Sequence, residues 1–186
     1  MTSFPYLEVQ GYEPTWQRGL KAVAATHGER LSALVGRRLA NAWLLWDRNE
    51  DRWFADAPVL LDFSGEQLEV QHQKFDELSL TWNTTDASKP VAFPDFDLFW
   101  RTDAVPELTR VAGAVVRAVS LLEWQGGDMA DGMVAVRLVV EGEQFTVFNA
   151  LDENGLAFGQ PMPQYIEYRL GECQHIRDGE SELEAP

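Results

Sequence analysis

The sequence predicts a mainly β protein: two tandem antiparallel β-meander repeats that form a pseudo-two-fold sandwich or barrel-like body, with one N-terminal helix. Three observations lead to this fold class. Residues 31–70 align with residues 108–147 without a gap, at a constant offset of 77 positions. Apolar and polar residues alternate in both segments, which is typical of strands with one buried face. A stretch with helical spacing precedes only the first segment.

The chain divides into four predicted parts. They are an N-terminal extension with the helix (1–30), a first β repeat (31–101), a second β repeat (102–170) and an acidic tail that we expect to be disordered (171–186). In the gap-free alignment 11 of 40 positions are identical, whereas average composition gives about two or three. Two unrelated hairpins of similar composition are the alternative interpretation.

The predicted helix lies in the N-terminal part. Trp16 and Leu20 are one helical turn apart, and Thr15 is a suitable N-cap. We expect Gly28 to end the helix and a short second turn to follow at 29–34. A helix outside the repeats could cover an edge or an open face of the sheet.

Each repeat opens with an expected strand of about ten residues. The two runs, RRLANAWLLW and AVVRAVSLLEW, contain neither Gly nor Pro. Their apolar positions break the period of two once, between Leu39 and Ala42 in the first repeat and between Val116 and Val119 in the second. A β-bulge at that place would account for the break.

Two glycines at matched positions predict hairpin turns. Gly65 and Gly142 each lie between two strand-like runs, where glycine supplies the positive φ of a tight turn. The apolar residues that flank the turns are expected to form the core. They are Val59, Leu61, Phe63, Leu68 and Val70 in the first repeat and Val136, Leu138, Val140, Phe145 and Val147 in the second.

The chain has 30 acidic and 15 basic residues and a formal net charge of −15. So large an excess argues against nucleic-acid binding, which needs a basic surface, and against binding to anionic membranes. It either serves solubility alone or steers a basic partner. The single cysteine excludes an intramolecular disulfide, and the N-terminus lacks the features of a signal peptide, so we expect the cytoplasm.

The sequence predicts no catalytic residue, no metal site and no cofactor. Its three histidines form no zinc motif, and Cys173 with His175 supplies only two ligands. No phosphate-binding or nucleophile motif occurs. The Asp-Glu pairs at 76–77 and 152–153 recur in both repeats, and we interpret them as turns and not as paired catalytic carboxylates.

Tryptophans mark the largest difference between the repeats. The first repeat has three of them where the second has Ser, Glu and Ala. Aromatic residues are enriched at interaction surfaces, so these tryptophans and two nearby aspartates are a candidate partner-binding site. Burial in the core is the alternative for the tryptophans. The candidate residues are Trp43, Trp46, Trp53, Asp47 and Asp51.

The leading hypothesis is a non-enzymatic cytoplasmic protein-binding module with an acidic surface, such as an immunity-type or regulatory partner of a basic protein. The alternative is a small-molecule-binding or hydrolytic domain with its site between the two repeats. A third hypothesis is a structural subunit that forms homo-oligomers through exposed strand edges. The sequence leaves the oligomeric state open.

Overall fold

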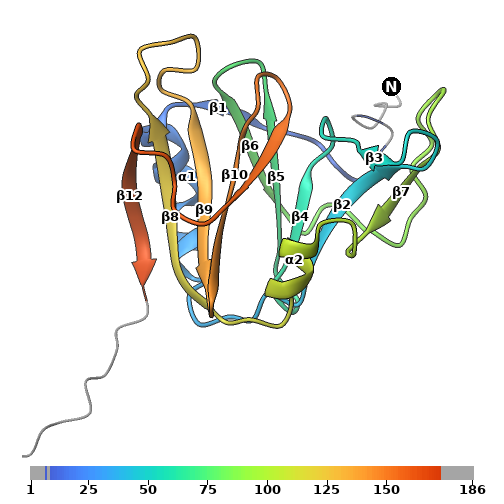
Figure 1. The fold of residues 1–186 in the computed structure, drawn as a ribbon, viewed down its shortest axis with the longest axis horizontal. Helices are drawn as coiled ribbons and strands as arrows, with labels where there is room; N and C mark the ends of the chain where they lie inside the picture. Colours follow the sequence, from blue (N-terminus) through green and yellow to red (C-terminus); the bar gives the residue numbers. More distant parts are fainter. Residues whose placement is uncertain (1–6, 8, 173–186) are drawn as a thin grey trace, which may run out of the picture.

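The computed structural model describes residue 7 and residues 9–172, which form two antiparallel β-sheets and two helices. The two sheets face each other across a shared core (Figure 1). Strands make up 43% of the chain and helices 12%, which confirms the mainly β prediction with a sandwich-like body.

The first sheet is built from one continuous stretch of chain, residues 16–101. Its order is β1-β6-β5-β4-β2, and both β3 and β7 also pair with β2. The strands are β1 (Trp16–Arg18), β2 (Asn41–Asp47), β3 (Arg52–Trp53), β4 (Val59–Asp62), β5 (Gln67–Gln73), β6 (Glu77–Trp82) and β7 (Leu98–Arg101).

The second sheet is equally continuous in sequence, with the order β11-β10-β9-β8-β12. Its last strand returns to pair with its first strand, β8, just as β7 returns to β2. Each repeat is therefore a four-strand meander (β2, β4, β5 and β6, or β8 to β11) whose first strand also pairs with a returning strand, β7 or β12; the first repeat has the short β3 in addition. The strands are β8 (Val116–Trp124), β9 (Val134–Val140), β10 (Glu143–Asn149), β11 (Asn154–Phe158) and β12 (Tyr165–Glu172).

The two sheets share their strand register as well as their order. Ala42 lies opposite Leu61 in the first sheet, and Val119 lies opposite Leu138, 77 positions further on, in the second. The next strand pair repeats the pattern, with Val59 opposite Val70 and 136 opposite 147. The duplication itself, which concerns the origin of the chain, stays a prediction.

The sheets meet at one end through a reciprocal set of backbone hydrogen bonds. Gly36 N donates to Val116 O (2.9 Å), and Gly113 N donates to Leu39 O (2.6 Å). These two bonds exchange places under the offset of 77, as expected for a pseudo-two-fold axis. An isolated bridge between Arg38 and position 115 lies in the middle of the set.

The space between the sheets is filled by apolar side chains. All ten residues predicted to flank the Gly hairpins belong to this inter-sheet core, and each is at most 2% exposed. The alternating pattern placed them correctly because a strand with one buried face has a period of two. Burying such side chains contributes about 1.5–3 kcal/mol each.

The local turn chemistry also agrees with the sequence. Gly65 has φ 98° and Gly142 has φ 82°, so both hairpin glycines adopt the left-handed region. The register of β8 shifts between Val116 and Ala118, which is the bulge predicted for the second repeat. In the first repeat β2 begins at Asn41, within the predicted break, and its pairing with β4 shows no register shift.

The N-terminal segment differs from the prediction. Residues 16–18 form β1 on the edge of β6, and helix α1 (Leu20–Ser32) begins after Gly19, at φ 76° and ψ 147°. Thr15 therefore does not cap the helix; its backbone N–H donates to Ser79 Oγ (2.9 Å). Gly28 does not end the helix either, because a glycine inside a packed helix costs only about 1 kcal/mol. The helix consequently passes the predicted boundary at residue 30.

The structure has a second helix, α2 (Pro106–Val111), whereas the sequence predicts only the N-terminal one. Its proline at the first turn fits a helix start, where no N–H is needed. Leu108 and Val111 contribute to the inter-sheet core. The predicted repeat boundary at 101/102 coincides with the end of β7, and the predicted tail lies outside the described residues beyond Glu172.

A smaller outer core covers the far face of the first sheet. Phe93 and Phe96 from the segment between β6 and β7 pack on Phe54, with ring centroids 5.1–5.8 Å apart. Buried Leu60 and Trp100 lie beneath this layer. The segment between β6 and β7 therefore packs on the first sheet through its aromatic residues.

Candidate functional site

Three aromatic side chains form a row across one end of the first sheet. Trp46 in the middle strand β2 lies opposite Trp53 of β3 on one side and opposite Phe99 of β7 on the other. Cross-strand partners in antiparallel sheets point to the same face, so the three residues, here called the aromatic row, share one face. It is the same face as Leu44, which belongs to the inter-sheet core.

Two arginines lie on the aromatic row. The guanidinium of Arg101 is 4.8 Å from the ring centroid of Trp46, and that of Arg48 is 4.4 Å from the ring of Phe99. Cation–π contacts of this kind contribute about 0.5–1 kcal/mol at exposed sites. Each arginine also pairs with an exposed carboxylate: Arg101 Nε with Asp103 (2.8 Å) and Arg48 Nε with Asp97 (3.8 Å).

The turn between β2 and β3 completes the surface. Trp46 Nε1 donates to Asp51 Oδ1 (3.0 Å), so this carboxylate fixes the orientation of the indole. Asp51 itself has φ 46°, which a short polar side chain tolerates. Glu50 beside it is exposed. The row is thus surrounded by carboxylates on both sides.

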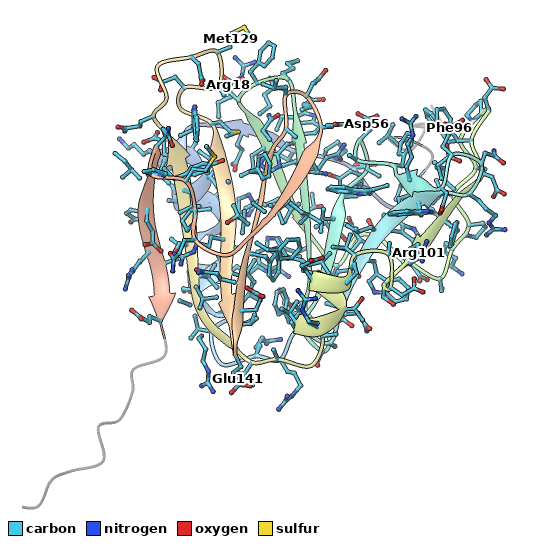
Figure 2. All side chains as sticks on the ribbon, in the orientation of Figure 1. Arg18, Asp56, Phe96, Arg101, Met129 and Glu141 are labelled. Atoms are coloured by element: carbon cyan, nitrogen blue, oxygen red, sulfur yellow. The ribbon has the colours of Figure 1, made fainter. Side chains whose placement is uncertain are left out.

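The aromatic row lies on the part of the first sheet that extends past the second sheet. In Figure 1 the strands β2, β3 and β7 project to the right of the sandwich, and Arg101 is labelled there in Figure 2. Trp53 packs against the inter-sheet core, whereas Trp46 and Phe99 are half-buried and belong to neither core among the described residues.

The structure brings together three of the five predicted site residues. Trp46, Trp53 and Asp51 are neighbours, but Trp43 and Asp47 belong to the opposite face of β2. Trp43 packs against the outer core, and Asp47 is 2% exposed and accepts the backbone N–H of Asn49 (2.9 Å). Asp47 therefore shapes the β2–β3 turn.

Sequence reasoning missed Phe99, Arg101 and Arg48. The alternation of β2 could have separated Trp43 from Trp46, because odd and even positions point to opposite faces. No such signal in the sequence indicates that β7 belongs to the site. β7 pairs with β2 although the paired residues are more than fifty positions apart, and a local sequence pattern does not predict so distant a pairing.

A polar groove of about 750 Å³ lies on the outer face of the second sheet. Arg137 is 9% exposed; its Nη1 donates to Glu167 (2.6 Å) and its Nη2 to Gln144. Partial burial raises the pKa of Glu167, but the hydrogen bond from Ser120 and the charges of its arginine neighbours outweigh this and lower it. Arg137 and Glu167 at the centre of this groove thus form an ion pair, while the buried Nε of Arg137 has no hydrogen-bond partner among the described residues.

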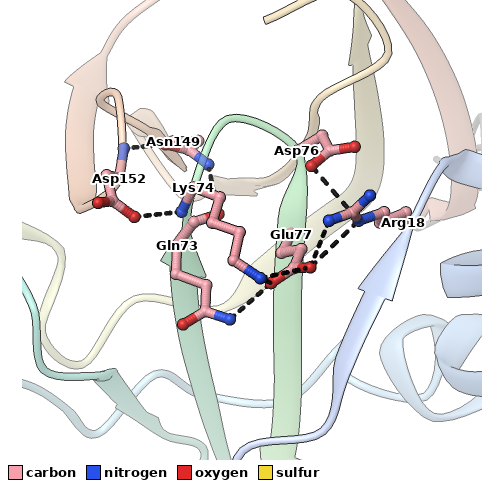
Figure 3. Close-up of polar contacts among 7 residues, drawn as sticks. All are labelled: Arg18, Gln73, Lys74, Asp76, Glu77, Asn149 and Asp152. Carbon is pink, nitrogen blue, oxygen red and sulfur yellow. Dashed lines mark hydrogen bonds and ion pairs between the residues drawn. The ribbon is translucent and has the colours of Figure 1, made fainter.

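The two Asp-Glu turns lie side by side at the other end of the sandwich (Figure 3). The backbone N–H of Lys74 donates to Asp152, and Asn149 Nδ2 donates to Gln73 O (3.3 Å). Asp76 and the pair 152–153 lie in turns or bends as predicted, whereas Glu77 is the first residue of β6. The Asp152 carboxylate links the two sheets, while Asp76 and Glu77 pair within the first sheet. The described residues bring no group of three or more His, Cys, Asp or Glu into a metal-binding arrangement.

Glu77 has the most perturbed carboxyl group of this junction. Partial burial raises its pKa, but hydrogen bonds from Arg18 (2.6 Å), Gln73 (2.5 Å) and Lys74 (3.1 Å) outweigh the burial and lower it to about 2. Arg18 also lies 3.5 Å from Asp76 (Figure 3). The group stays ionised near neutral pH and is occupied by its partners, which is typical of a structural ion pair.

Apolar side chains fill the space between the sheets. His72 lies there, 1% exposed, with an oxygen atom 3.0 Å from each ring nitrogen. A second groove, beside Trp43, also lies outside the sandwich.

The chain matches no protein-family model, no curated protein and no solved structure. Among the described residues no helix is long and apolar enough to cross a membrane.

Proposed function

We propose that this chain is a non-enzymatic cytoplasmic protein-binding module that docks a basic partner protein on the aromatic row. One observation carries the proposal: Trp46 and Phe99 are large aromatic side chains that neither hydrophobic core uses. Side chains of this kind, with an arginine stacked on each, are the residue types enriched at protein interfaces. An immunity-type or regulatory partner protein would have this character.

The charge around the row supports a basic partner. Exposed Glu50, Asp51, Asp97 and Asp103 surround it, and the whole chain has a net charge of −15. A negative field of this kind accelerates the approach of a positively charged protein and suppresses that of an acidic one. The interaction should weaken as salt is added.

Site-specific photo-crosslinking tests the proposal. The photoreactive residue p-benzoylphenylalanine is placed at Phe99, and at Met129 as a control, since Met129 is 71% exposed at the far end of the molecule (Figure 2). In a low-salt extract of the cells that make the protein, we expect one discrete adduct at Phe99 with a protein that mass spectrometry identifies as basic. Equal labelling at both positions, or none at Phe99, would overturn the proposal.

A pair of tryptophan variants sharpens the test. Trp46 and Trp124 each donate an indole N–H to a nearby aspartate, Trp46 to Asp51 (3.0 Å) and Trp124 to Asp128 (3.1 Å). Trp46→Ala should lower the yield of the Phe99 adduct at least about tenfold, the effect of a hot-spot residue. Trp124→Ala, a matched loss on another surface, should leave the yield unchanged.

A further inference from the structure

Among residues 9–172, β12 has the longest free strand edge. β12 has eight residues, whereas the other strands that end a sheet have two to five. It pairs with β8 on one side, and no described residue pairs with its other side. Figure 1 shows it at the end of the molecule opposite to β7. Proteins normally protect such an edge with Lys, Pro, a short strand or a bulge, and β12 has only a bulge, between Arg169 and Gly171 near its end.

Exposed apolar side chains gather at this edge. Ile166 is 49% exposed and Tyr168 is 48% exposed, and Met162, just before the strand, is 56% exposed. These are three of the six large hydrophobic side chains that are exposed among the described residues. The same strand therefore presents both unpaired backbone groups and apolar surface, the two features that a partner strand would cover.

We propose that β12 pairs antiparallel with β12 of a second copy of this chain, with Tyr168 opposite itself on a two-fold axis. A two-fold axis normal to the sheet leaves the two faces of the sheet unexchanged. In an antiparallel pair such an axis lies midway between one residue and the same residue of the second copy. With Tyr168 on the axis, Glu167 lies opposite Arg169 of the second copy, twice. The neighbouring registers place Glu167 opposite Glu167 or Arg169 opposite Arg169, and like charges repel.

The apolar face of β12 favours the same register. The two Tyr168 rings meet at the axis of this register, whereas Leu170 lies in the bulge of β12 between Arg169 and Gly171. Leu170 already packs near helix α1, with its Cδ2 3.4 Å from the Cβ position of Gly28. The second sheet then continues through both copies, and the aromatic rows stay free at the two far ends. This inference does not rest on the proposed protein-binding function.

Mass and concentration give the first test. Light scattering on the purified full chain should show twice the 21.0 kDa of the chain at high concentration, and dissociation on dilution. Tyr168→Lys places two ammonium groups together at the axis and should raise the dimer dissociation constant at least about tenfold. Phe75→Lys, at a side chain 42% exposed on another turn, is the matched control and should dimerise as the unaltered chain does.

Disulfide trapping tests the register itself, in a Cys173→Ser background that removes the single natural cysteine. Opposite residues of antiparallel strands have Cα atoms about 4.5–5.5 Å apart, within disulfide reach, so Tyr168→Cys should crosslink to itself on mild oxidation. Two Ile166→Cys residues would be about 13 Å apart and should not crosslink.

The outcomes separate cleanly. A monomer at every concentration, a dimer that persists in Tyr168→Lys, or equal crosslinking of Ile166→Cys and Tyr168→Cys would each overturn the proposal. Circular dichroism and a thermal melt on every variant show that the chain is folded. If Tyr168→Lys fails to fold, the cysteine series still decides, because its substitutions are at exposed or half-buried positions.

Discussion

His72 is a buried side chain in which both ring nitrogens face oxygen atoms. Nδ1 lies 3.0 Å from Asn154 Oδ1, and Nε2 lies 3.0 Å from the carbonyl oxygen of Val134, so the imidazole bridges the two sheets. Burial lowers its pKa, although both hydrogen bonds oppose this. The neutral ring can donate to only one of the two oxygens.

This histidine should make the fold acid-sensitive. The unfolded chain takes up a proton below about pH 6.5, which the folded chain resists, so stability is complete above that pH and falls as the pH decreases toward the folded pKa. The slope should approach about 1.4 kcal/mol per pH unit. Urea unfolding between pH 7.5 and 5 measures it.

Two variants show whether His72 causes the pH dependence of the free energy of unfolding. His72→Gln should flatten it, since the amide does not titrate. His27→Gln should have a smaller effect, because His27 is only half-buried, although burial and Arg30 also lower its pKa. An unchanged slope in His72→Gln would contradict this account.

Glu77 provides a second titration at lower pH. Glu77→Gln removes the carboxylate that Arg18 and Lys74 share and should cost about 1–2 kcal/mol at pH 7, since both cations are largely exposed. The depressed pKa means that this stability is present above about pH 4.5 and is lost as the pH falls toward 2. In urea unfolding, the difference in free energy of unfolding between the unaltered chain and Glu77→Gln should therefore decrease as the pH falls from about 4.5 toward 2. A difference that stays constant would show that the ion pair is not its cause.

At the level of single elements, the hairpin glycines allow a direct comparison of the two sheets. A Cβ added at Gly65 or Gly142 would meet nothing within 4 Å, so only the positive φ opposes a side chain. Gly65→Ala and Gly142→Ala should each lower the free energy of unfolding by about 1–2 kcal/mol.

Gly28→Ala is the opposite case within the same chain. Gly28 lies inside α1, where alanine is favoured by about 1 kcal/mol and its Cβ would make an ordinary contact with Leu170. The substitution should leave stability unchanged or raise it. A loss equal to that of the two hairpin variants would show that side-chain volume, and not backbone conformation, decides these positions.

The sequence predicts the elements that local rules determine. The buried rows around Gly65 and Gly142 and the bulge in β8 follow from the period of two and from turn chemistry. At the N-terminus a tertiary contact decides the local structure instead. Residues 16–18, where helical spacing predicts a helix, form β1 on the edge of β6, and Arg18 donates a hydrogen bond to Glu77. Propensity is a weak prior against such a contact.

The candidate site could be predicted only in part for the same reason. Composition singled out Trp46, Trp53 and Asp51, which do lie together. Their remaining neighbours come from β7, whose partner strand is fixed by the chain crossing the sheet. A composition-based signal cannot report such a pairing, nor does it tell Trp43 from Trp46.

For the whole molecule, the excess of negative charge predicts a salt effect on folding. At a net charge of −15 the compact chain repels itself. Raising NaCl from about 0.01 M to about 0.15 M shortens the Debye length from about 30 Å to about 8 Å and should raise the melting temperature. Near the sequence pI of about 4.5 the net charge vanishes, so the same salt step should have little effect there. A salt effect equal at both pH values would show that self-repulsion is not its origin.

Each sheet uses one uninterrupted stretch of chain, yet helix α1 from the first stretch packs against β8 and β12 of the second. A cut in the short connection after β7 would leave both sheets whole. Helix α1 would then be part of the N-terminal fragment but would pack on β8 and β12 of the C-terminal fragment. Two separately made fragments could recognise each other through this contact. The connection between Arg101 and Pro106 is accordingly the place at which this protein could be divided into a two-part reporter.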